Sequence, residues 1–226
     1  MAIAITVICM LIIAFVHFRE GLFTAVMALV NVILAGLVAF NFFEPLADLL
    51  DVVFQGTFLE SYEDWFVLMT LFCVMLVLLR VLTNNLANMQ VHFSAVPQQL
   101  GGVLVGLLIG YLVSGFLICA AETLPWHENF MDFKPRVADE PPIRRFFPPD
   151  RVWLSLMRHA GAYGFARGAD NEEADERYDR HPTFDRAGTF ELRYLRYRRH
   201  SENRAPLMYS GELEAELHPL PRPAGP

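Results

Sequence analysis

Four long apolar runs, separated by short polar segments, dominate the first half of this 226-residue chain. They cover residues Ala2–Phe18, Leu22–Phe43, Trp65–Leu82 and Gln98–Ala121. A helix of about 20 apolar residues crosses the hydrocarbon core of a bilayer, so each run predicts a transmembrane helix. The first run is short, but no Lys or Arg precedes it and no small-residue cleavage site follows it. We therefore interpret it as a retained span and not as a signal peptide.

The segment between the second and third runs has an amphipathic pattern. Pro45 suits the first turn of a helix, and Gly56 suits its end. Apolar residues fall on one face of this helix and acidic residues on the other: Leu46, Leu49, Leu50, Val53 and Phe54 against Glu44, Asp48 and Asp51. The pattern predicts a separate helix that lies in the membrane interface.

The fourth run carries a small residue at every fourth position, at Gly102, Gly106, Gly110 and Ser114. Each glycine costs a soluble helix about 1 kcal/mol relative to alanine. In lipid, such a stripe lets another helix backbone approach closely, and packing and polar contacts then hold the pair together. We predict that the stripe packs this span against its own neighbours. Dimerisation with a second copy and the lining of a solute path stay open as alternatives.

Charge divides the chain into two unlike parts. Of the 18 Lys and Arg residues only Arg19 and Arg80 precede residue 122. This contrast indicates a membrane region followed by a polar tail. We predict an all-α membrane bundle of about four transmembrane helices over residues 1–121 and a Pro-rich linker over 122–149. A polar, small or partly disordered soluble tail of α+β character then follows over 150–226.

Two segments of the tail have regular patterns. Asp150 suits the N-cap of a helix over Arg151–Ala162. Farther on, Phe190, Leu192 and Tyr194 alternate with charged residues, which predicts a strand. Basic and aromatic side chains interleave there as a candidate contact surface for a partner or for anionic lipid: Arg193, Tyr194, Arg196, Tyr197, Arg198 and Arg199. The alternative is a solvated basic edge. Because acids outnumber bases in the tail, there is no strong nucleic-acid signal.

Motifs of enzyme chemistry are absent from the sequence. It has no P-loop, dinucleotide-binding glycine motif, nucleophile elbow or HExxH zinc motif. The histidines are scattered, and the three cysteines lie inside apolar runs. We therefore expect no enzyme, no cofactor and no metal site. The intramembrane polar residues Asn31 and Asn41 are expected to hydrogen-bond neighbouring helices.

The layout of the spans resembles the colicin V production (CvpA) family of small bacterial inner-membrane proteins. The resemblance covers residues 1–121. It rests on an N-terminal span, the link FREGLFTAV into a second span, an amphipathic third span, and the Gly-rich fourth span LGGVLVGLLIGYLVSGF. It implies about four spans in the bacterial inner membrane and a role in colicin V production or export or, more loosely, in envelope maintenance. It brings no catalytic residues.

The few charges between the spans predict a topology. The loop between spans two and three lacks Lys and Arg, so the ends that hold Arg19 and Arg80 are expected in the cytoplasm. Four spans then place both termini and the tail outside, although the tail arginines favour the reverse. Three functions stay open. They are an accessory or organising protein that contacts other membrane proteins or itself, an oligomeric channel or export conduit, and an anchor whose tail binds a partner.

Overall fold

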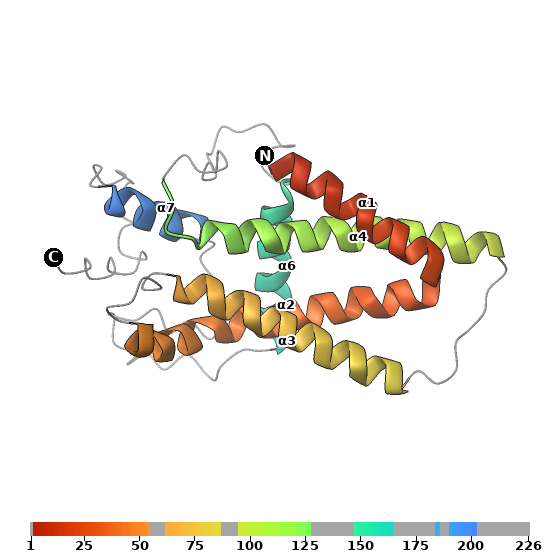
Figure 1. Cartoon of the computed structure of the whole chain (residues 1–226), viewed down its shortest axis with the longest axis horizontal. Coiled ribbons are helices and arrows are strands. Elements are labelled where there is room, and N and C mark those ends of the chain that lie inside the picture. Colours follow the sequence, from red (N-terminus) through yellow and green to blue (C-terminus); the bar gives the residue numbers. More distant parts are fainter. Residues whose placement is uncertain are drawn as a thin grey trace.

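A computed structural model of the chain describes residues 2–54, 62–86, 95–127, 147–164, 184–185 and 190–202. Its helices are α1 (Ala2–Glu20), α2 (Leu22–Phe54), α3 (Glu63–Leu86), α4 (Ala95–Glu122), α6 (Pro149–Gly164) and α7 (Phe190–Ser201) (Figure 1). The first four are long and apolar enough to cross a membrane, which confirms the four predicted spans. Most of the predicted linker and much of the tail lie outside the described residues.

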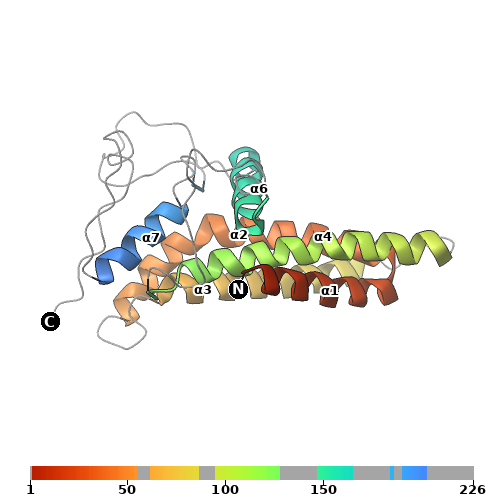
Figure 2. The same cartoon turned by 90° about the horizontal axis from the view of Figure 1, so that it is seen from above.

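The four long helices form an elongated bundle (Figures 1 and 2). α1 packs along α4 and runs in the opposite direction, while α2 packs against both α3 and α4. The chain reverses between α1 and α2 at Gly21, which has φ = 93°. Side chains of L-residues disfavour this conformation, so glycine permits the tight turn between the two spans.

The small-residue stripe of α4 faces α1. The nearest neighbours of the stripe on α1 are His17 for Gly102, Ala14 for Gly106 and Met10 for Gly110. A Cβ atom at Gly106 would lie 2.8 Å from the Ala14 Cα atom, so the two backbones leave no room for a side chain there. Ser114 is buried and donates a hydrogen bond of 2.7 Å to the Tyr111 carbonyl oxygen. Within one copy of the chain, α1 therefore covers the glycines.

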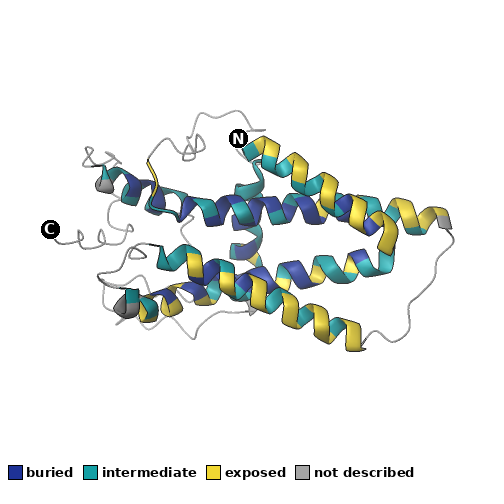
Figure 3. Ribbon diagram, in the orientation of Figure 1, coloured by how far each residue is buried: buried dark blue, intermediate teal, exposed yellow. Residues whose placement is uncertain are grey.

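Aromatic rings fill the centre of the bundle, where the buried residues lie (Figure 3). They come from four helices: Phe40 of α2, Phe72 of α3, Phe116 of α4 and Trp153 of α6. Phe72 and Phe116 stack with their ring centroids 3.8 Å apart, and the Trp153 ring meets Phe116 edge-on at 5.9 Å. Gly36 lies directly against the Trp153 ring, and Gly115 lies against Pro149 and Trp153 of α6; neither glycine has room for a Cβ atom.

Helix α6 crosses α2 and α4 instead of running along them. It lies crosswise in Figure 1 and is seen nearly end-on in Figure 2. Its side chains Trp153 and Met157 are fully buried, so α6 is anchored to the spans by its apolar face. The predicted helix at residues 151–162 is confirmed, with Asp150 in its first turn.

The predicted interfacial helix after Pro45 is wrong as a separate element. α2 runs continuously from Leu22 to Phe54 and contains Pro45. Proline removes one backbone hydrogen bond from a helix, and tertiary contacts on both sides of it offset that loss. Phe43 and Ala47 are buried in the core, and Glu44 forms an ion pair with Arg193 of α7.

The strand predicted from Phe190 to Tyr194 is also wrong, because these residues begin α7. The buried residues Phe190, Tyr194 and Arg198 are spaced by four and share one helical face. A strand would instead have buried Leu192 together with Phe190 and Tyr194. The spacing of buried positions over the whole segment therefore outweighs the short alternation at its start.

The outer surfaces of α1 and α3 are apolar and exposed (Figure 3). Their exposed side chains include Ile3, Val7, Leu11 and Phe15 on α1, and Val74, Val77, Leu78 and Val81 on α3. Such a surface is suited to lipid chains, because aliphatic side chains and lipid tails are equally apolar.

Candidate functional site

Two polar pairs connect α7 to α2 and to the start of α3. Tyr194 donates a hydrogen bond of 2.8 Å to Asp64 Oδ2, and Arg193 Nη2 lies 2.6 Å from Glu44 Oε1. The Arg193 guanidinium also lies 5.1 Å from the centre of the Tyr194 ring. Hydrogen bonds that involve a charged group are stronger than neutral ones, so these pairs fix α7 against the bundle.

A third contact joins α7 to the end of α4. Arg198 Nη1 donates a hydrogen bond of 2.7 Å to the Glu122 carbonyl oxygen. The last carbonyl groups of a helix have no intrahelical donor, so Arg198 supplies one. We call the residues of these three contacts the tail junction: Glu44, Asp64, Glu122, Arg193, Tyr194 and Arg198.

The two tail helices are also linked to each other and to the aromatic core. Arg151 of α6 lies 3.5 Å from Glu191 of α7, between Nε and Oε1. The backbone N–H of Phe190 donates to Asp185 Oδ1 at 3.1 Å, which caps the start of α7. The Phe190 ring lies 5.9 Å from Phe40 of the core. Both polar pairs and aromatic packing therefore hold α7 in place.

Burial determines the protonation of Tyr194 at the tail junction. It raises the pKa of the Tyr194 hydroxyl well above its usual range, and the neighbouring Asp64 carboxylate adds to this effect. Burial likewise raises the pKa of Tyr197 and of the Asp150 carboxyl group in α6. Tyr194 therefore keeps its proton and acts as a hydrogen-bond donor throughout the neutral range.

The structure divides the predicted contact residues of the tail into two groups. Three bind within the chain at the tail junction: Arg193, Tyr194 and Arg198. The other three are half-buried on the remaining surface of α7: Arg196, Tyr197 and Arg199. Arg193, Tyr194 and Arg198 are thus bound to the bundle by contacts within the chain.

The two intramembrane asparagines make different contacts. Asn31 of α2 accepts a hydrogen bond of 3.1 Å from the Thr83 hydroxyl of α3, which joins two spans. Asn41 instead donates to the Leu37 carbonyl oxygen of its own helix at 2.8 Å, and its amide lies beside Gly161 of α6. The asparagines do not form a common site with each other or with the glycine stripe.

Sequence reasoning missed the groups that receive the tail. Glu44 was assigned only to the acidic face of the predicted interfacial helix, Asp64 was given no partner in the tail, and Gly36 and Gly115 lie outside the regular stripe. A signal was nevertheless present. Isolated glycines in the second and fourth apolar runs indicate close approach of another element, and acidic residues next to a span indicate a basic partner.

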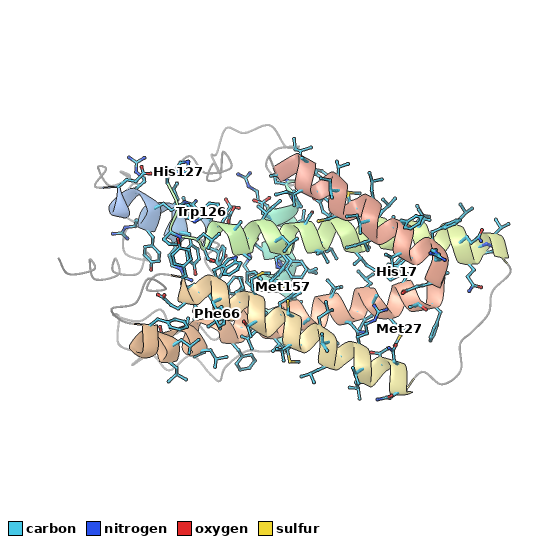
Figure 4. The ribbon with its side chains drawn as sticks, viewed as in Figure 1. His17, Met27, Phe66, Trp126, His127 and Met157 are labelled. Carbon is cyan, nitrogen blue, oxygen red and sulfur yellow. The ribbon has the colours of Figure 1, made fainter. Side chains whose placement is uncertain are left out.

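A smaller polar cluster lies at the opposite end of the bundle, near His17 in Figure 4, whereas Met157 of α6 lies close to its middle. His17 Nδ1 lies 3.3 Å from Glu20 Oε2, and Arg80 Nη2 lies 3.3 Å from Glu20 Oε1. This cluster joins the ends of α1 and α3. Among the described residues, no group of three or more His, Cys, Asp or Glu side chains is placed to hold a metal ion.

The fold and its apolar surface define a multi-pass helical membrane protein. The family model described as Colicin V production protein matches residues 2–135, which is more than half of the chain. The chain therefore belongs to the colicin V production family, as its layout of spans and glycines predicted. Comparisons with curated proteins and with solved structures give no match.

The tail junction predicts a specific effect of removing one hydroxyl group. Tyr194→Phe deletes the hydrogen bond to Asp64, and a hydrogen bond to a charged group contributes about 1.5–3 kcal/mol. Local opening of α7 should then become about ten- to a hundredfold more frequent, because each 1.4 kcal/mol changes an equilibrium tenfold. Hydrogen exchange followed by mass spectrometry measures this as faster exchange in residues 190–202.

Tyr197→Phe is the matched control, because it removes a hydroxyl from the same helix outside the tail junction. It should leave the exchange rates of α7 unchanged. Equal exchange rates in Tyr194→Phe and the unaltered chain would contradict the assigned role of the Tyr194–Asp64 hydrogen bond.

Proposed function

We propose that this chain is an accessory, organising protein of the bacterial inner membrane. It acts through contacts with other envelope proteins in the production or export of a colicin-type toxin or in envelope maintenance. Membership of the colicin V production family supports the membrane setting and the process. The interior of the bundle favours an organising role over a conduit.

The packed interior is the observation that carries this proposal. Phe40, Phe72, Phe116 and Trp153 occupy the centre, and their ring contacts leave the middle of a single copy filled with side chains. The glycine stripe of α4, which was the candidate lining for a solute path, lies against the α1 backbone. Both features favour a solid scaffold over a channel.

The docked tail further supports a scaffold. A simple anchor needs only a loose connection between its spans and a working tail, whereas α6 and α7 contact the bundle through buried side chains. Such contacts hold the outer surfaces of the tail helices in a fixed orientation relative to the membrane. A fixed surface is what an organising protein offers to its partners, because less ordering is then needed on binding.

We place the tail on the outer side of the membrane. Arg80 and Glu20 form an ion pair, so Arg19 and Arg80 share one end of the bundle, and the positive-inside rule assigns that end to the cytoplasm. Three tail arginines that favour the reverse orientation bind acidic side chains or a carbonyl group within the chain: Arg151, Arg193 and Arg198.

Deletion of the gene in toxin-producing cells tests the proposed process. The amount of active toxin in the medium should fall, or the cells should become more sensitive to detergent, and the unaltered chain should restore both properties. In parallel, liposomes that contain the purified protein should show no more permeability to ions or small solutes than empty ones. Normal toxin release together with a normal envelope would reject the organising role, and a clear rise in permeability would favour a conduit.

A single cysteine tests the side of the tail. Cys9, Cys73 and Cys119 are replaced, and Glu202→Cys is introduced just after α7. A membrane-impermeant thiol reagent applied to intact spheroplasts should label this cysteine before lysis. Labelling only after lysis would place the tail in the cytoplasm and reverse the topology, without altering the proposal of an organising role.

A further inference from the structure

Helix α6 lies across the spans. Its position along the bundle follows from the residues that face each other between α1 and α4. Facing residues of the antiparallel pair α1 and α4 are Met10 with Gly110 and Ala14 with Gly106. Extending this register places Gly115 about level with Ile5 of α1. Trp153 of α6, which contacts Gly115, therefore lies at the same level. With a rise of about 1.5 Å per residue, α6 lies about 5 Å inside the start of α1.

The length of α1 relates this depth to the bilayer. Its 19 residues span about 28 Å, which is close to the roughly 30 Å thickness of the hydrocarbon core. The apolar run of α4 ends at Ala121, about 9 Å beyond Gly115 by the same helical rise, so α6 lies about 5–9 Å inside the end of the apolar part of the bundle. This is the depth of helices that rest in the plane of the interface.

The two edges of α6 differ in chemistry. Arg151 pairs with Glu191 of α7, and α7 lies at the end of the bundle where α4 ends, so this edge of α6 faces that end. Arg158 follows two turns later and lies on the same edge as Arg151. The opposite edge carries Leu156 and Ala160, and the outermost residue, His159, is exposed. Trp153 faces the bundle, so the helix cannot rotate without losing its anchor.

We propose that α6 is an in-plane membrane helix whose edge at Arg158 binds the phosphate groups of anionic phospholipids in the leaflet on the tail side. Within the part of the chain that the structure describes, no hydrogen bond or ion pair engages the half-buried Arg158. A guanidinium group matches a phosphate with two parallel hydrogen bonds, and its alkyl stem extends along apolar surface to reach the headgroups. Leu156 and Ala160 then contact the acyl chains.

The depth of the two edges is tested first. In a cysteine-free variant reconstituted into vesicles of phosphatidylcholine and phosphatidylglycerol, Leu156→Cys or Arg158→Cys is labelled with a nitroxide. Molecular oxygen should relax the label at position 156 more strongly, and a water-soluble nickel chelate should relax the label at position 158 more strongly. Equal and high access of the nickel chelate to both labels would overturn the proposal and leave α6 as a surface for soluble proteins. Equal exclusion from both would also overturn it.

Lipid selectivity is tested with Arg158 itself. Spin-labelled phosphatidylglycerol and phosphatidylcholine are compared for the fraction immobilised at the protein surface. Arg158→Gln should lower the preference for phosphatidylglycerol, while Arg158→Lys, which keeps the positive charge, should retain most of it. An unchanged preference in Arg158→Gln, or an equal loss in both variants, would contradict binding of lipid phosphate at this edge.

Discussion

The close approach of backbones at the glycines of α4 is the constraint on which the rest of the structure depends. Within lipid, burial of apolar surface gives helices no reason to associate, so packing at short range must hold them together. One face of α4 uses Gly102, Gly106 and Gly110 to admit the α1 backbone. Another face uses Gly115, with Gly36 of α2, to admit Trp153 of α6. A single span therefore holds both the first span and the first tail helix.

Hydropathy was sufficient to predict the spans, because each long apolar run can bury its backbone polar groups in lipid only as a helix. It was insufficient at Pro45, where a proline and nearby acids indicated a break. α2 continues there because Glu44 has a partner, Arg193, more than 100 residues away. The same limit applies at α7. The spacing of Phe190, Tyr194 and Arg198 was visible in the sequence, but the groups that receive them, such as Asp64, were not.

The surfaces that the chain can offer to partners follow from this packing of the helices. With the stripe covered by α1 and the centre filled by aromatic rings, the described part of the chain offers partners its outer surfaces. The tail junction fixes α7 against α2, α3 and α4, and Trp153 fixes α6 across α2 and α4. The family relation could be predicted from the layout of spans and glycines. The docking of the tail could not, because it depends on contacts such as Tyr194 with Asp64, which are 130 residues apart.

The most direct measurement is the thermal stability of Gly106→Ile in detergent, compared with Leu104→Ile as a control. A side chain at Gly106 would meet the α1 backbone, whereas Leu104 is 68% exposed on the same helix. Overpacking of this kind costs typically about 1–3 kcal/mol. We expect a clearly lower unfolding temperature for Gly106→Ile and no change for Leu104→Ile. Equal unfolding temperatures for the two variants would contradict the packing of α1 on the glycines of α4.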